Sequence, residues 1–173
     1  MLPHFRMFAG YNRWANRRLY DAVRALPDAD YRADRGAFFG SLRGTLNHIL
    51  VADRIWLHRF TGEGHAPRAL DAILHDAFAD LEPARTAEDE RIIAFVAALD
   101  EARLDATFPY SPISTPDQTI VQPLREALAH VFNHQTHHRG QAHTLLTILG
   151  GRNAAPSIDL LLFQRSDEYR GMQ

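Results

Sequence analysis

Residues 130–146 read HVFNHQTHHRGQAHTLL, and this stretch holds five of the ten histidines of the chain. His130, His134 and His138 follow one another at intervals of four residues. On a helix each such step turns the side chain by only about 40°, so the three imidazoles share one face. A proline before the stretch and a pair of glycines after it predict that the helix spans residues 123–150.

Apolar side chains at three-and-four spacing predict other helices in the chain. The full set of predicted helices covers residues 3–26, 41–61, 86–106, 123–150 and, as a shorter fifth helix, 157–168. Ser41 is the expected N-cap of the second helix, and Thr86 with Asp89 resembles a capping box at the start of the third. Residues 63–83 are expected to be a connecting excursion. Residues 107–122, rich in proline and β-branched residues, suggest a loop with a short hairpin.

Composition limits the classes of function. The chain has 173 residues, 46% of them hydrophobic and 23% charged, which predicts one globular domain over residues 1–173. A formal net charge of −2 and scattered arginines argue against nucleic acid as a partner. No segment reaches the ~18 consecutive apolar residues that a membrane span needs, and no targeting segment is visible, so we expect a cytoplasmic protein.

The chain has no cysteine and ten histidines, so a transition-metal site must use imidazole or carboxylate ligands. His134 and His138 lie on adjacent turns and can converge on one ion, as paired histidines do in zinc enzymes. His130 is about 12 Å from His138 along the helix axis and cannot easily join them. His48, on the apolar stripe of another long helix, is the best third ligand. Three imidazoles would leave open positions on the ion, which is typical of catalytic sites.

The other histidines are given structural roles. We expect His130 and His143 to be hydrogen-bond partners in the core or of the ligands, and His137 to support the site. Isolated histidines are usually surface residues or satisfied core residues, which is the interpretation for His4, His58, His65 and His75. Asp53 is expected to have a structural role, through an ion pair or as a helix cap.

Three stretches of the chain carry a resemblance to a known family. They are YNRWANRRLYDAV at residues 11–23, LNHILVADRIWLHRF at residues 46–60, and the histidine-rich stretch at residues 130–146. In this order, and with the string NHxxHHRGQ in the last of them, the sequence resembles the DinB family of DinB/YfiT-like putative metalloenzymes. The resemblance implies a four-helix bundle with an additional short C-terminal helix. It also implies a histidine triad of metal ligands at His48, His134 and His138.

The resemblance further implies one divalent ion per chain, Ni²⁺ or Zn²⁺ before Fe²⁺ or Mn²⁺, and a homodimer. The first hypothesis for the function is a metal-dependent enzyme in which the ion activates a low-molecular-weight thiol or water, as a thiol S-transferase or a hydrolase. Arg139 and Gln141 are candidates for contact with a small-molecule substrate, against a helix bridge and a surface amide. The second hypothesis is a stress-related, metal-binding structural protein without turnover.

Overall fold

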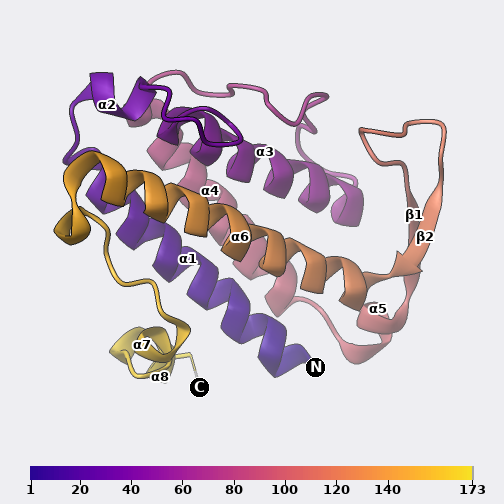
Figure 1. The fold of residues 1–173 in the computed structure, drawn as a ribbon. Coiled ribbons are helices and arrows are strands. Elements are labelled where there is room, and N and C mark those ends of the chain that lie inside the picture. Colours follow the sequence, from indigo (N-terminus) through magenta and orange to yellow (C-terminus); the bar gives the residue numbers. More distant parts are fainter. Residues whose placement is uncertain (173) are drawn as a thin grey trace.

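The computed structural model describes residues 1–172 and has four long helices, as predicted. They are α1 (Leu2–Arg24), α3 (Leu42–Thr61), α4 (Phe78–Ala97) and α6 (Leu124–Gly150). Helix α1 packs against α4 and α6, and α3 packs against the same two helices, so the four enclose one core. Figure 1 shows that α1 and α6 run in one direction and α3 and α4 in the opposite one.

This topology needs one long crossover, because α3 ends at the opposite end of the bundle from where α4 begins (Figure 1). Residues 62–77 run back along the bundle and make this connection as irregular chain. They correspond to most of the predicted excursion. The crossover passes over α3, which brings backbone from residues far along the chain next to the N-terminal half of that helix.

The ends of α3 follow the local chemistry of the sequence. The Ser41 side chain accepts a hydrogen bond from the backbone N–H of Gly44, which confirms it as the N-cap. At the other end Gly62 takes a left-handed conformation with φ 75°, and its N–H bonds to the carbonyl of His58. These two signals fix the helix within the predicted range.

Three predicted boundaries were wrong. Helix α4 begins at Phe78 and not at Thr86, with Pro83 inside it, and it ends at Ala97 instead of Ala106. Asp100 then caps a separate short helix, α5 (Glu101–Asp105). The predicted fifth helix is two short helices, α7 (Leu160–Gln164) and α8 (Asp167–Arg170).

Three smaller elements connect or follow the long helices. Helix α2 (Asp28–Arg32) lies between the first two predicted helices, where no helix was predicted. Strands β1 (Thr107–Tyr110) and β2 (Ile120–Pro123) form the expected antiparallel hairpin, with Thr107 opposite Pro123. A 3₁₀ turn at Arg152–Ala154 follows α6. None of these changes the all-α class.

A polar layer crosses the middle of the otherwise apolar core. Arg85 on α4 pairs with Asp53 on α3 at 2.6 Å and with Asp89 at 3.0 Å, and all three side chains are at most 4% exposed. Asn16 on α1 donates to Asp89 at 2.9 Å, and Arg139 on α6 bonds to Asn12 on α1. Asp53 therefore makes the structural ion pair that the sequence suggested.

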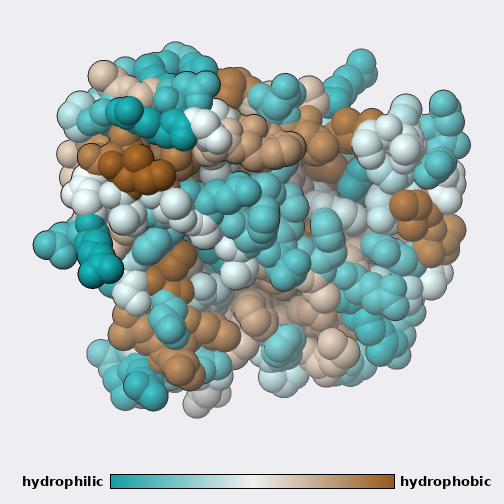
Figure 2. All heavy atoms as spheres, viewed as in Figure 1, coloured by the Kyte–Doolittle hydropathy of each residue, from teal (hydrophilic) through white to brown (hydrophobic). Residues whose placement is uncertain are grey.

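The surface is mostly hydrophilic on the face that Figure 2 shows. Hydrophobic patches on this face lie near the hairpin, near the C-terminal helices and over the C-terminal end of α6. Exposed hydrophobic residues of these elements are Val121, Leu161 and Ile148. In the part of the chain that the structure describes, no helix is both long enough and apolar enough to cross a bilayer.

Candidate metal centre

Two antiparallel helices bring three imidazoles together. His134 and His138 lie one turn apart on α6, and His48 faces them from the second turn of α3. Nε2 of His48 is 3.2 Å from Nε2 of His134 and 3.2 Å from Nε2 of His138. One nitrogen from each of the three rings lies within 4.8 Å of the other two, so the group could hold a metal ion.

Hydrogen bonds on the far sides of two rings set their tautomers. Nδ1 of His48 donates to the backbone carbonyl of Leu70 at 2.7 Å, since a carbonyl can only accept. Nδ1 of His138 lies 2.8 Å from Oε1 of Gln141 and donates to it in the same way. With a proton on Nδ1, a neutral imidazole keeps a free lone pair on Nε2. Both lone pairs therefore point into the cluster.

The protonation of the rings suits ligation as well. Burial lowers the pKa of His48, while the bond to Leu70 raises it in part. Burial, together with the neighbouring imidazoles, lowers the pKa of His134 to about 3. Burial lowers the pKa of His138 to about 4, against the opposite effect of Gln141. At neutral pH all three rings are uncharged, which is the form that binds a metal.

The distances fit the radius of a divalent ion. Two nitrogens at about 2.05 Å from a tetrahedral Zn²⁺ lie about 3.3 Å apart, and the two Nε2–Nε2 distances from His48 are 3.2 Å. The Nε2 lone pairs of His48 and His138 converge at this distance and repel one another unless a cation lies between them. The donor set thus matches a borderline divalent metal, such as Zn²⁺ or Ni²⁺.

A cavity of about 450 Å³ opens beside the three rings. The Phe39 ring stacks on the His48 ring, with 3.8 Å between centroids and 19° between planes, and it covers one side of the cluster. Phe38 and Leu70 continue the apolar wall, and Gln141 and His137 lie on the α6 side. A small molecule in this cavity would touch the exposed side of the imidazoles.

Comparison with known proteins identifies the family of the chain. The model of the DinB family matches residues 1–172. This chain belongs to the DinB family. The Protein DinB of Bacillus subtilis (strain 168) is 27% identical over 169 residues, which cover 91% of this chain and 93% of the relative. The membership that the three sequence stretches implied is thereby confirmed.

The remaining histidines of this DinB-family chain lie outside the cluster. His137 is exposed and accepts from Nε2 of Gln141 at 3.1 Å, so it supports the amide that holds His138. His143 bonds to the carbonyl of Pro156 at 3.0 Å, which ties α6 to the segment before α7. His130 is exposed, which contradicts the core position that was one of its two expected roles. Its ring lies 5.1 Å from the Trp56 ring and 5.7 Å from the His134 ring, beside the cluster.

Three contributors to the site were not foreseen in their roles. The carbonyl of Leu70 belongs to the crossover, and a backbone acceptor has no signature in the sequence. Phe39 lies between the first two predicted helices, outside every predicted element, and stacks on His48. Gln141 was a candidate for substrate contact, but it holds His138; its position three residues on, on the same helix face, could have revealed this. Arg139 is buried and bridges α6 to α1, as one of the two interpretations had it.

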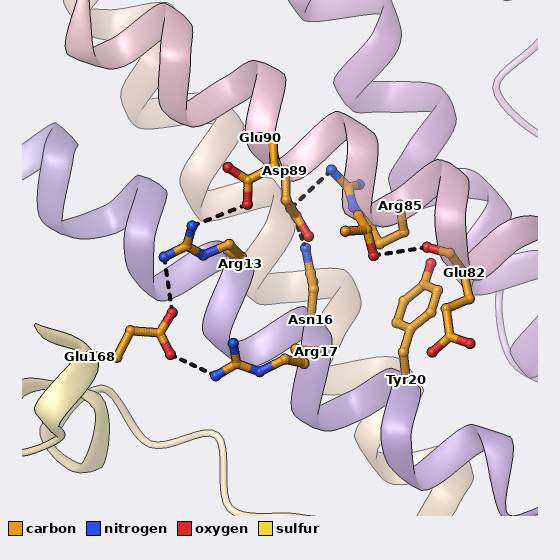
Figure 3. Close-up of a pocket in the computed structure, with 10 residues that line it drawn as sticks. Arg13, Asn16, Arg17, Tyr20, Glu82, Arg85, Asp89, Glu90 and Glu168 are labelled. Atoms are coloured by element: carbon orange, nitrogen blue, oxygen red, sulfur yellow. Dashed lines mark hydrogen bonds and ion pairs between the residues drawn. The ribbon is translucent and has the colours of Figure 1, made fainter.

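A second cavity of the DinB-family bundle, about 400 Å³, lies between α1 and α4 and contains none of the three histidines. Figure 3 shows that its charged side chains turn toward one another. Glu168 on α8 binds Arg17 at 2.6 Å and Arg13 at 3.1 Å, and Arg13 also binds Glu90 at 3.1 Å. Because these charges are paired within the protein, this cavity is best explained as an ionic connection between α1, α4 and α8.

Proposed function

We propose that this protein binds one divalent transition metal ion through His48, His134 and His138 and is a metal-dependent enzyme that activates a thiol or water. Ni²⁺ and Zn²⁺ suit three imidazoles best, and Fe²⁺ and Mn²⁺ are further candidates. The observation that carries the proposal is the convergence of three ring nitrogens, 3.2 Å apart for the two His48 pairs, beside a cavity of about 450 Å³.

The protein's own residues would prepare this site for chemistry. The Leu70 carbonyl and the Gln141 amide fix the ring orientations before any ligand arrives. Phe39 stacks on His48 and keeps water from that side of the cluster. When bound, the ion would lower the pKa of a coordinated thiol or water and so supply a nucleophile near neutral pH.

The alternative, a structural ion without turnover, has less support. An ion that only joined α3 to α6 would add little, because these helices already pack against each other through buried apolar residues such as Leu46 and Leu145. A structural site is also usually closed by protein ligands. The cavity beside the imidazoles favours access for a small molecule.

Metal content of protein purified without an affinity tag tests the proposal. Elemental mass spectrometry should find near one ion per chain in the wild type and a loss of it in His48→Ala, His134→Ala and His138→Ala. His143→Ala is the matched control, because His143 lies on the same helix but bonds to the Pro156 carbonyl. A wild type that holds no metal and cannot be loaded with Zn²⁺, Ni²⁺ or Mn²⁺, or a His143→Ala variant that loses it equally, would contradict the assignment.

The activity and the assembly are tested separately. Metal-loaded wild type and His134→Ala would be compared for thiol transfer and for hydrolysis, and turnover is expected only where the ion is retained. The homodimer stays a prediction. Size-exclusion chromatography with light scattering would measure the mass, against 19.6 kDa for one chain.

A further inference from the structure

The wall of the cavity beside the three histidines is apolar and aromatic. Phe38 is 84% exposed, an unusual exposure for a large apolar ring, and its edge packs on Phe39 with 4.9 Å between centroids. Leu70 is 43% exposed on the crossover, and Ile73 follows it at 40%. Exposed apolar side chains that gather at the mouth of a cavity mark a binding surface more often than isolated ones do.

The cavity wall also lacks basic side chains. All 19 basic residues of the chain are arginines, and none of them lines this cavity in the described part of the chain. Asp71 is the only acidic residue among its lining residues, and it is exposed. A ligand that carries a carboxylate or phosphate would therefore meet no cation in the protein wall and one like charge.

Arginines on the flanking segments are engaged elsewhere. Arg43, on α3, pairs with Asp76. Arg59 lies over the Trp56 ring at 4.6 Å and donates to the Ser111 carbonyl at 2.8 Å. Arg68, two residues before Leu70, is exposed and is not among the lining residues. Recruiting an arginine to an anionic ligand would mean breaking such contacts or ordering an exposed side chain, which costs entropy.

We propose that this cavity takes an uncharged ligand with a flat apolar group, which packs on Phe38 and Phe39 while its thiol or other donor atom faces the three imidazoles. Anionic thiols and other acidic substrates would be disfavoured. The inference rests on the proposed metal function, and it names the substrate class of that same site.

Two thiols that differ only at the end remote from sulfur test the substrate class. Phenylmethanethiol is neutral, and 4-(sulfanylmethyl)benzoate has the same thiol and ring with one added carboxylate. Isothermal titration calorimetry on zinc-loaded protein would give both affinities, after the metal content has been measured. Both thiols would meet the zinc ion through the same sulfur, so the comparison reports on the wall. The neutral thiol should bind about threefold more tightly, because Asp71 is exposed and water screens its charge. Asp71→Asn should reduce the difference in affinity between the neutral thiol and the benzoate.

Variants of residues in and near the cavity wall test whether the wall determines the affinity for the two thiols. Phe38→Ala should weaken the neutral thiol about tenfold through lost apolar contact, with the zinc content unchanged. Val121→Ala, which removes an exposed apolar side chain on the hairpin, is the control and should bind like the wild type. Arg68→Gln should leave both affinities as they are.

Several results would overturn the inference while leaving the metal site intact. They are a benzoate that binds as tightly as the neutral thiol, a Phe38→Ala variant with wild-type affinity, or a preference for the benzoate that Arg68→Gln abolishes. A protein that fails to load zinc at the first step would instead contradict the proposed function.

Discussion

Replacing Arg85 with methionine should destabilise the protein far more than any surface charge change. Arg85 is the only cation in direct contact with both Asp53 and Asp89 among the described residues, and all three side chains are buried. Burial works to lower the pKa of Arg85, but Asp89 and Asp53 together raise it, so its charge is secure. Methionine keeps much of the side-chain volume and removes the charge.

The stability lost in Arg85→Met can be estimated from the groups that stay buried without Arg85. Two carboxylates would be left in the core with only amide partners, such as Asn16 for Asp89. Removing one partner of a buried ion pair typically costs ~3–5 kcal/mol. For a chain of this length each kcal/mol lowers Tm by about 2–4 °C, so a decrease of roughly 6–20 °C is expected.

The stability lost in Arg85→Met should become smaller as pH falls. Burial raises the pKa of Asp53 to about 6 even with Arg85 lowering it, and burial also raises the pKa of Asp89. Without Arg85 both values rise further, while the unfolded chain keeps pKa values of about 3.9. The folded variant then binds protons that the unfolded chain releases. Its free energy of unfolding, relative to wild type, should recover as pH falls from about 7 toward the pKa of about 6 that Asp53 has in the wild type, because below that value both folded proteins carry the proton.

Urea unfolding, followed by circular dichroism at several pH values, measures both effects. Arg17→Met is the matched control, since it removes an arginine that pairs with Glu168 at the surface and should change stability by no more than ~1 kcal/mol. The reasoning is refuted if the free energy of unfolding decreases as little in Arg85→Met as in Arg17→Met. It is also refuted if the loss at pH 7 stays constant down to pH 4.

Two further predictions concern α3 and α6. A Cβ at Gly44 would lie 2.0 Å from the carbonyl oxygen of Phe39, so Gly44→Ala should cost about 1–3 kcal/mol in thermal or urea unfolding and displace the ring on His48. Gly140→Ala, whose Cβ would meet nothing within 4 Å, should instead gain about 0.5–1 kcal/mol; a loss there would contradict the argument. Ser41→Ala should cost about 1 kcal/mol through the lost N-cap, whereas Ser41→Asp should retain wild-type stability.

The long helices were predictable because each keeps an apolar period over many turns. The start of α4 was not, because Pro83 ordinarily marks a helix boundary and here lies inside the helix. Phe78 extends the helix upstream, with its ring packed against Tyr20 at 5.6 Å and Tyr31 at 5.5 Å. These tertiary contacts outweigh the local signal, and they join segments that a sequence pattern cannot pair.

The candidate metal ligands also differ in whether a local sequence pattern could predict them. The interval of four between His134 and His138 is a local signal, and it predicted their shared face directly. His48 required the further inference that α3 lies opposite α6, which its apolar stripe and the family resemblance supplied. The orientation of the His48 ring by Leu70 depends on the path of the crossover, and no pattern in residues 62–77 indicates that path.

The three histidines lie on long helices, whereas much of the cavity wall lies on the segments that connect the helices. The three imidazoles project from long helices that the whole bundle holds in place. Phe38 and Leu70 come from connections that carry little of the core. Substitutions in these connections can therefore change which molecules are accepted without loss of the histidine cluster. Libraries of variants at these loops would be an economical way to redirect the selectivity of this scaffold.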